Sequence, residues 1–551
     1  MKRAIASLIL TIGLTTPSLA QQSGALLAGQ AAQNASDFAA AGPLYLRASH
    51  GQPNNLSLVN QALSALVASG DMDQAIHLSK AIEDAGAATP ISNLVNWAAL
   101  IAADDYAAVQ TMMAKTPIVG QAVDALLDGW TLIDRGEIEL ALARFDEAAV
   151  QEDMRRFANY QKAVALAHLG RWDDAKAALG DPQGTQAIAV SAAILAVNGD
   201  IDGAKSMLDP IRQADLSRWL LARLNDGETP ALWPTTAKEG VAEVLFQIAN
   251  SLHGDGDEDI LLIYTRLARM IHPNHIPAIY MSGQLLRDVD NNPLAVIALE
   301  QVPDDHHLAN AAKILLGNAQ WDLESRDVAL ETLIANAKLH KSTPRAHRAL
   351  GDMYRRDKNY RQAAKSYGRA INLSEDEGQQ DWWSHYTRAI SYERLGRWRW
   401  AEADFRTALE YRPDEARVLN YLGYSLVVRR EKLKEALDMI QKAVNLRPDA
   451  GYIIDSLGWA KFKLGMYEDA VPDMEKAVSS MAVDPIVNDH LGDVYWAVGR
   501  KIEARFQWKR ALDFVTDDTD LEELDPDRIQ RKLSDGLDKV LADEGTPLKV
   551  R

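Results

Sequence analysis

The chain has 551 residues, a formal net charge of −18, 47% hydrophobic residues and 25% charged residues. This length exceeds the roughly 100–200 residues of a single domain, and the composition is neither disordered nor collagen-like, so we expect several domains or a repeat array. The negative charge argues against nucleic acid, whose phosphates need a basic face. The sequence contains no cysteine, which excludes disulfides, thiolate metal sites, cysteine nucleophiles and the cysteine of a bacterial lipoprotein anchor.

The first twenty residues predict a secretory signal peptide. Lys2 and Arg3 precede an apolar run over Ala4–Leu14, and small residues stand before Gln21, so cleavage is expected after Ala20. An N-terminal membrane anchor is the alternative, but it needs about 18–20 consecutive apolar residues, and the run is about half as long. No later segment is apolar enough to span a bilayer. We therefore expect an exported protein with no transmembrane segment, periplasmic in a Gram-negative cell.

After this segment the sequence repeats with a period near 34 residues. In the unit that starts at Ala416, one helix face carries Leu419, Leu422, Gly423 and Leu426, and a second helix carries Ala436, Ile440 and Ala443. Similar spacing recurs in fourteen candidate units, which start at Gln22, Leu56, Pro90, Ala122, Arg156, Thr185, Ala242, Ile276, Asn310, Pro344, Trp382, Ala416, Gly451 and Pro485.

This pattern resembles the tetratricopeptide repeat, which has Leu-Gly at positions 7 and 8, Ala at 20, a large residue at 24 and Pro at 32. Small residues at positions 8 and 20 let two helices approach closely, and larger residues fill the space between them. A single hairpin cannot bury its apolar face, so neighbours must stack on it. The resemblance implies an all-α fold, a right-handed α-solenoid of about fourteen helical hairpins with a C-terminal capping helix.

The register of the repeat predicts the domain organisation. It lapses between Pro210 and Gly240, where Asp226–Pro230 reads as a loop. We expect a signal peptide over 1–20, an N-terminal array over 22–209, an irregular connector over 210–241, a C-terminal array over 242–518, and a capping helix and tail over 519–551. The capping helix itself is expected over Pro526–Leu541.

No catalytic motif is present, so we expect no enzyme, no cofactor and no metal. The pairs His272 with His275 and His306 with His307 lack the spacing of a metal site, and we expect solvated loop histidines. Asp255, Asp257 and Asp259 imitate the start of a calcium loop, but Ile260 replaces the required glycine, which favours a solvated turn.

One stripe of the first helices carries a candidate binding site. At about 100° per residue, positions 2, 5, 9 and 12 share a face beside the packed one, and in tetratricopeptide repeats that face lines a concave groove. The four units starting at Trp382, Ala416, Gly451 and Pro485 have sixteen such positions. Seven of them are aromatic, namely Trp383, Tyr386, Tyr424, Tyr452, Trp459, Phe462 and Trp496. The candidate peptide-binding residues are Trp383, Tyr386, Asn420, Tyr424, Tyr452, Asp455, Trp459, Phe462, Arg345, Arg348 and Arg355.

Large rings with polar neighbours suit the binding of an extended or helical polypeptide. Two alternatives stay open. The rings at positions 9 and 12 can instead pack against the neighbouring repeat, with Trp496 the weakest candidate for the groove. The three arginines can form a solvated or salt-bridged face rather than a carboxylate clamp. Because aromatic rows also stack on sugars, the alternative function is a glycan- or peptidoglycan-binding envelope module.

The stretches 419–426, 455–460 and 488–497 also resemble large exported proteobacterial tetratricopeptide proteins, including the lipoprotein adaptor of a periplasmic carboxyl-terminal processing protease. This likeness covers about 100 residues. It implies a non-catalytic scaffold of the cell envelope that binds proteins or peptides, with a protease and its substrates as partners. The sequence lacks the lipid-anchor cysteine of that adaptor, which puts tethering to a membrane in doubt.

Overall fold

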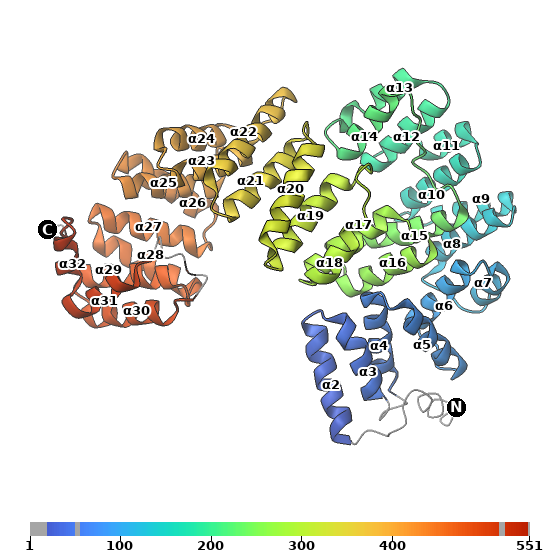
Figure 1. Ribbon diagram of the computed structural model, residues 1–551, viewed down its shortest axis with the longest axis horizontal. Coiled ribbons are helices and arrows are strands. Elements are labelled where there is room, and N and C mark those ends of the chain that lie inside the picture. Colours follow the sequence, from blue (N-terminus) through green and yellow to red (C-terminus); the bar gives the residue numbers. More distant parts are fainter. Residues whose placement is uncertain (1–18, 50–54, 517–518, 520–523, 549–551) are drawn as a thin grey trace. The chain divides into compact units, whose positions relative to one another are not determined.

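The computed structural model describes residues 19–49, 55–516, 519 and 524–548, and every regular element in these ranges is a helix (Figure 1). Most of the expected signal peptide, residues 1–18, lies outside the described residues. The chain divides into two compact units, a first unit that ends at His340 and a second unit that begins at Lys341. No helix within the described ranges is long and apolar enough to cross a membrane.

The helices of the first unit are α2 (Leu19–Asn34), α3 (Phe38–Ser49), α4 (Leu56–Ser69), α5 (Met72–Asp84), α6 (Pro90–Ala102), α7 (Tyr106–Met113), α8 (Gln121–Asp134), α9 (Ile138–Ala149), α10 (Arg155–His168), α11 (Trp172–Leu179), α12 (Thr185–Val197), α13 (Ile201–Met207), the 3-10 helix η1 (Asp209–Ile211), α14 (Asp215–Asn225), α15 (Ala237–Leu252), α16 (Glu258–Ile271), α17 (Ile276–Asp288), α18 (Asn292–Leu299), α19 (Ala309–Asp322) and α20 (Arg326–Leu339).

The helices of the second unit are α21 (Pro344–Arg356), α22 (Tyr360–Asp376), α23 (Trp382–Arg394), α24 (Trp398–Tyr411), α25 (Ala416–Arg429), α26 (Leu433–Leu446), α27 (Gly451–Leu464), α28 (Tyr467–Ser480), α29 (Pro485–Ala497), α30 (Lys501–Asp513), α31 (Pro526–Asp535) and α32 (Leu537–Asp543). In the described ranges, all but α14, α31 and α32 pair with a neighbour in the chain into fourteen hairpins. The prediction of an all-α array of about fourteen hairpins is therefore confirmed.

Within a hairpin, a glycine of the first helix lies against a large side chain of the second. A Cβ atom added at Gly492 would lie 2.4 Å from Trp508, and one at Gly351 would lie 2.6 Å from Tyr367. At Gly423 it would meet both Ile440 at 2.7 Å and the carbonyl oxygen of Ala436 at 2.9 Å. The two helices thus approach so closely that position 8 has no room for a side chain.

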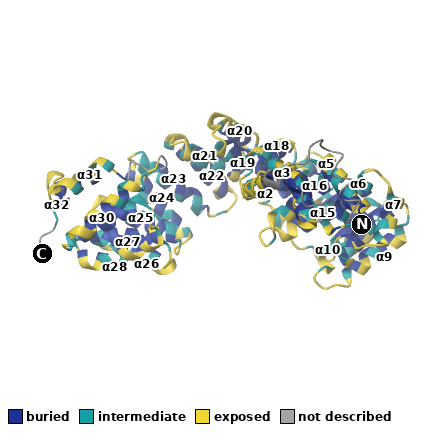
Figure 2. Ribbon diagram, turned by 90° about the horizontal axis from the view of Figure 1, so that it is seen from below, coloured by how far each residue is buried: buried dark blue, intermediate teal, exposed yellow. Residues whose placement is uncertain are grey.

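The turn inside each hairpin also follows from local chemistry. Gly170, Gly396 and Gly499 adopt positive φ there, a conformation that glycine reaches at little cost. In the hairpin of α21 and α22, Lys358 takes the positive-φ position instead, and Asn359 caps α22 by accepting a hydrogen bond from the backbone N–H of Gln362. Figure 2 shows that such turns are exposed, whereas the helices have buried faces.

In the first unit the chain folds back onto its own N-terminal repeats. Helix α15 packs against α8, and α16 packs against α4 and α6 (Figure 1). Trp130, at position 9 of its repeat, lies directly on the backbone of Gly240, and Arg266 Nε donates to the carbonyl oxygen of Ala68 at 3.2 Å. The stripe of α4, α6 and α8 is therefore covered by helices of the same unit.

The compact units divide the chain at another place than the predicted domain boundaries, which stay a prediction. The connector expected over 210–241 contains α14 and the end of η1, and only residues 212–214 and 226–236 lack regular structure before α15 begins. The two compact units meet at residues 340 and 341 rather than in the connector. The physical reason is that the lapse in register marks the place where the chain turns back, and residues 237–340 then pack with the N-terminal array.

The C-terminal cap consists of two helices rather than the single helix expected over Pro526–Leu541. Gly536 separates them with a φ of 88°, and a Cβ atom there would lie 2.5 Å from Trp496. Lys532 on α31 is fully buried, and its Nζ lies 2.8 Å from Asp489 and 2.7 Å from Asp493, both on α29. The cap is therefore attached to the last hairpin by a buried charge cluster.

Replacing Gly423 with Ala tests the close helix approach. The new methyl group would meet the backbone of Ala436, which cannot rotate away, so we expect a loss of about 1–3 kcal/mol in the free energy of unfolding. Gly368→Ala is the control, because its Cβ would meet only the end of Arg388 at 3.4 Å. That helical position should gain up to about 1 kcal/mol in urea denaturation. Equal stability of the two variants would contradict the packing.

Replacing Lys532 with Met should remove the counter-charge of the buried Asp489 and leave Asp493 with only the guanidinium of Arg528, 3.9 Å away, at a cost of about 3–5 kcal/mol. Burial raises the pKa of Asp489 although Lys532 lies beside it. A carboxyl with a raised folded-state pKa stabilises the fold only below its unfolded pKa, and this contribution is lost as pH rises through the folded pKa. Without Lys532 the pKa of Asp489 rises further. The free energy of unfolding that Lys532→Met costs should therefore be larger at about pH 8 than at about pH 5.

The matched control is Lys539→Met on α32, whose side chain is 60% exposed and pairs with Asp543. An exposed pair of this kind contributes little, so urea denaturation should show almost no change. A loss at Lys539 as large as that at Lys532, or a Lys532→Met deficit independent of pH, would rule out the buried cluster as the attachment.

Candidate functional site

The structure divides the eleven candidate residues into two groups. Asn420, Asp455, Trp459 and Phe462 are buried, with less than a tenth of each side chain exposed. The other seven are half-buried or exposed, namely Arg345, Arg348, Arg355, Trp383, Tyr386, Tyr424 and Tyr452. Their role in binding stays a prediction, but the two groups have different surroundings.

The buried group packs between successive first helices. Asp455 on α27 lies 3.0 Å from Nδ1 of His490 on α29, and the rings of Trp459 and His490 stack with centroids 3.8 Å apart. Phe462 lies parallel to Trp459 at 4.9 Å. Positions 5 and 9 therefore contribute here to the contact between neighbouring repeats, which is the alternative that the sequence left open. Trp496 is buried in the same way against Gly536 of the cap.

Asn420 on α25 is also buried, and its Oδ1 has no hydrogen-bond donor among the described residues. Tyr424, four residues later on the same helix, is half-buried and packs against the apolar cluster that contains Trp459 and Phe462. Asn420 therefore presents no open side chain, whereas Tyr424 is half-buried, as Tyr386 is.

Four side chains, which we name the open row, come from four consecutive first helices: Arg355 on α21, Tyr386 on α23, Arg417 on α25 and Tyr452 on α27. The pKa of Tyr386 is raised to about 12, mainly by burial. The charges of Arg417 and Arg355 act against this rise, and Tyr452 adds to it. The Tyr386 hydroxyl is therefore within electrostatic range of the other three groups. Tyr452 is 42% exposed.

Arg417 was not among the candidate residues, although it occupies position 2 of its repeat, on the predicted stripe. Its guanidinium lies 5.0 Å from the ring centroid of Trp383 and 5.5 Å from that of Trp382. Nε also donates to Glu415 at 2.9 Å. The count of aromatic residues missed Arg417, whereas a count of all large polar and aromatic residues on the stripe could have found it.

The three predicted arginines are tied to acids to different degrees. Arg348 Nη2 donates to Asp381 at 2.7 Å; burial raises the pKa of Asp381, but Ser384 and Arg348 lower it more, so it falls below its usual range. Arg355 Nε donates to the Tyr367 hydroxyl at 3.3 Å, and Arg345 is exposed. The salt-bridged alternative thus describes Arg348 and, with a longer contact of 4.0 Å between Arg355 Nη2 and Asp352, also Arg355, whereas Arg345 is exposed.

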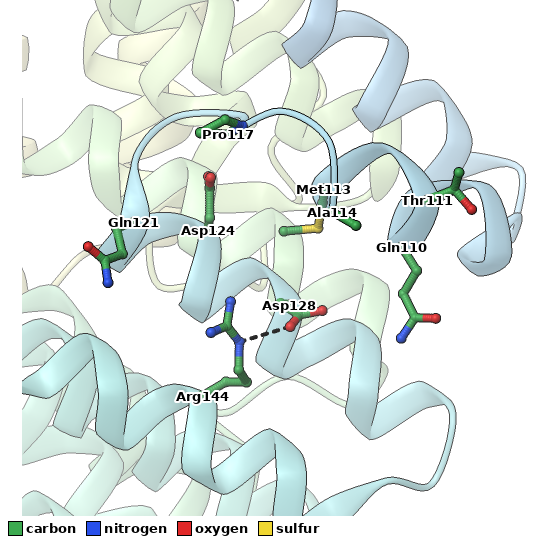
Figure 3. A pocket seen from close by; sticks show the side chains of 9 residues that line it. All are labelled: Gln110, Thr111, Met113, Ala114, Pro117, Gln121, Asp124, Asp128 and Arg144. Atoms are coloured by element: carbon green, nitrogen blue, oxygen red, sulfur yellow. Dashed lines mark hydrogen bonds and ion pairs between the residues drawn. The ribbon is translucent and has the colours of Figure 1, made fainter.

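A pocket of about 650 Å³ lies in the first unit between α7, α8 and α9 (Figure 3). Asp124 accepts hydrogen bonds from the backbone N–H groups of Ile118, Val119 and Gly120, and Arg144 Nε donates to Asp128 at 2.9 Å. These charged groups already have partners inside the protein, so the pocket offers no obvious recognition of a charged ligand.

The histidine pairs differ from the solvated loops that the sequence suggested. His275 is buried, caps α17 by accepting from the N–H of Ala278 at 3.2 Å, and lies 3.1 Å from Glu243. Burial lowers the pKa of His306 to about 4 and that of His307 to about 3. These side chains serve packing, and among the described residues no three His, Asp or Glu side chains gather in a way that could hold a metal.

Comparison with known proteins supports the repeat assignment. The family model described as tetratricopeptide repeat matches residues 314–379 and 386–452. A TPR repeat-containing protein of Pseudomonas aeruginosa is 38% identical over 108 residues, which make up 20% of this chain and 18% of that protein. The chain thus spans under a fifth of this relative.

Solved structures give a weaker likeness. A tetratricopeptide repeat protein from Parabacteroides merdae has a TM-score of 0.38 and 17% identity, covering 47% of this chain and 97% of its own. The APC/C hetero-tetramer Cut9–Hcn1 has a TM-score of 0.39 and 14% identity, covering 97% and 98%. The family match and the packing of glycine against large residues agree with the 34-residue period. The chain therefore contains tetratricopeptide repeats.

Proposed function

We propose that the chain is a non-catalytic scaffold that binds a polypeptide along the first helices of its second unit. The open row is the observation that supports this proposal most, because it takes one large side chain from each of four successive repeats. A segment running across these helices would contact each side chain in turn. Tyrosines provide large contact areas at low entropy cost, and arginines donate several hydrogen bonds to carbonyl or carboxylate groups.

The first unit supports binding less well than the second. The stripe of α4, α6 and α8 is covered by α15 and α16, and Trp130 on that stripe is fully buried. Tetratricopeptide repeats that close on themselves in this way have no stripe left for another chain. The proposal therefore places the ligand on the second unit alone.

The same contacts favour a polypeptide over a glycan. Sugars stack on flat, open ring faces, but Trp459 already stacks on His490, and the guanidinium of Arg417 lies over Trp383. The arginine and tyrosine side chains of the open row can instead donate hydrogen bonds to the carbonyl groups of a polypeptide. Binding to peptidoglycan nevertheless remains a defined outcome of the experiment below.

We also propose that the protein is exported, with cleavage after Ala20, and acts as an adaptor for a cell-envelope protease. Both ideas rest on the sequence resemblance. Within the three resembling stretches, Asp455, Trp459 and His490 are buried in contacts between repeats. The resemblance therefore supports shared packing more than a shared partner, and the protease has to be tested directly.

The double variant Tyr452→Ala with Arg417→Ala should lose most of the proteins that the wild-type chain captures from a cell-envelope extract. Removing two central contacts should weaken binding by about ten- to a hundredfold. Quantitative mass spectrometry of the captured proteins measures the loss, and circular dichroism confirms that the variant is folded.

The matched control is Trp400→Ala with Arg397→Ala on the neighbouring hairpin. This pair has the same kind of contact, with the guanidinium 4.9 Å from the ring centroid, and Trp400 is 55% exposed. It should leave capture unchanged. If both double variants capture the same proteins as the wild type, or if the chain binds purified peptidoglycan and no protein, the proposed function is wrong.

A further inference from the structure

In the first unit, the loop between α18 and α19 holds helix α14, although the two are far apart in the chain. Trp219 Nε1 on α14 donates to the carbonyl oxygen of Asp305 at 2.7 Å, and the guanidinium of Arg223 lies 3.8 Å from the carboxylate of Asp305. Asn310, near the start of α19, donates to Asp215 at 3.2 Å. We call this contact, between α14 and residues 303–310, the latch.

Two histidines shape the loop of the latch. His306 Nδ1 accepts a hydrogen bond from the backbone N–H of Leu308 at 3.2 Å. A ring nitrogen can accept only while it carries no proton, so this contact needs a neutral imidazole. The ring centroids of His306 and His307 lie 4.2 Å apart, and the ring of His307 meets that of Trp219 edge-to-face at 6.0 Å. The loop therefore reaches α14 through rings of which one must be uncharged.

The surroundings of both rings favour the neutral form. Burial lowers the pKa of His306 to about 4, although the charge of Asp305 raises it, and His275 lowers it further. Burial also lowers the pKa of His307 to about 3, and the neighbouring His306 adds to this fall. Both rings therefore bind a proton more weakly while the loop lies on α14 than after it has left.

Charged and titratable groups from several elements surround the two rings. They are Asp215 and Arg223 of α14, Glu243 of α15, His275 before α17, Asp304 and Asp305 of the loop, Lys313 of α19 and His340 after α20. The two acids of the loop already face cations, since Asp304 lies 3.1 Å from Lys313 and Asp305 lies 3.8 Å from Arg223. These acids therefore offset a proton on either ring only in part.

We propose that the latch is released by acid: protonation of His306 breaks its hydrogen bond to Leu308, and the loop then leaves α14. The protonated ring has an N–H where an acceptor is required, so two donors point at each other. Helices α15 and α16 remain packed on α8 and α4, because these contacts involve none of the latch residues. The first unit thus opens at one edge and keeps its core. The latch is independent of the open row and of what the second unit binds.

The sign and size of the pH dependence follow from the same groups. A base whose pKa lies below the ordinary 6.5 in the closed latch stabilises that state above pH 6.5. This contribution is lost as pH falls from 6.5 towards the pKa of about 4 in the closed latch. Between pH 7 and pH 5, the equilibrium constant for release should therefore rise about 20-fold for the first ring that is freed.

Hydrogen exchange of the full chain, measured by mass spectrometry at pH 7 and pH 5, tests the latch. Protection factors are compared, because they remove the pH dependence of the intrinsic exchange rate. We expect the protection of residues 303–312 to fall about 20-fold at pH 5, while α8 stays protected. Equal protection of residues 303–312 at both pH values would overturn the proposal, and so would an equal fall in α8, since the whole unit would then unfold in acid.

The double variant His306→Asn with His307→Phe removes both titrating rings and keeps the shape of the loop. The asparagine oxygen can accept the same backbone N–H two residues later, and phenylalanine keeps an aromatic ring beside Trp219. This variant should be as protected at pH 5 as at pH 7. His77→Gln on α5, outside the latch, is the control and should respond to acid as the wild type does. A double variant that still loses protection in acid would overturn the proposal.

Trp219→Phe tests whether α14 holds the loop. It keeps a ring beside His307 but removes the N–H that binds the carbonyl oxygen of Asp305. The loss of one hydrogen bond should lower the protection of residues 303–312 about fivefold at pH 7. Unchanged protection in this variant would show that the loop is stable without α14, which contradicts the latch.

Discussion

The close contact between a small residue of the first helix and a large residue of the second is the constraint on which the rest of the structure depends. It brings the helices of each hairpin together, as at Gly492 and Trp508, and leaves one apolar face that only another hairpin can cover. The neighbouring first helices then meet through positions 5 and 9, as Asp455 and Trp459 meet His490. What is left for binding is decided by which side chains this packing does not use.

This dependence explains how far the sequence alone could predict the fold. The contact between positions 8 and 24 lies within one hairpin, so a 34-residue period was enough to place the hairpins. The return of α15 and α16 onto α4, α6 and α8 joins residues far apart in the chain, and no local pattern signals it. The same holds for the C-terminal cap, where the approach of Trp496 to Gly536 accompanies a break that helix periodicity alone does not show.

The candidate site was predicted in part for the same reason. The spacing correctly identified a stripe, but it could not tell rings that pack against the next repeat from rings at the surface. Trp459 and Phe462 are buried between repeats, whereas Tyr452 is exposed. Arg417 was missed because only aromatic residues were counted on the stripe, although its contact with Trp383 on another helix could not be read from the spacing. The result is a chain with two kinds of repeat array. The first unit uses its stripe for its own stability, and the second keeps part of its stripe for the open row.

The accessibility of individual rings tests this account most directly. Hydroxyl-radical footprinting of the free chain, read by mass spectrometry, reports how fast each aromatic side chain is modified. We expect Tyr452 and Trp400, which are 42% and 55% exposed, to react quickly, and Trp130 and Trp459, which are 0% and 7% exposed, to be protected. If Trp130 and Trp459 react as fast as Tyr452, the rings assigned to packing are open in both units, and the division between rings that pack and rings that stay exposed is wrong.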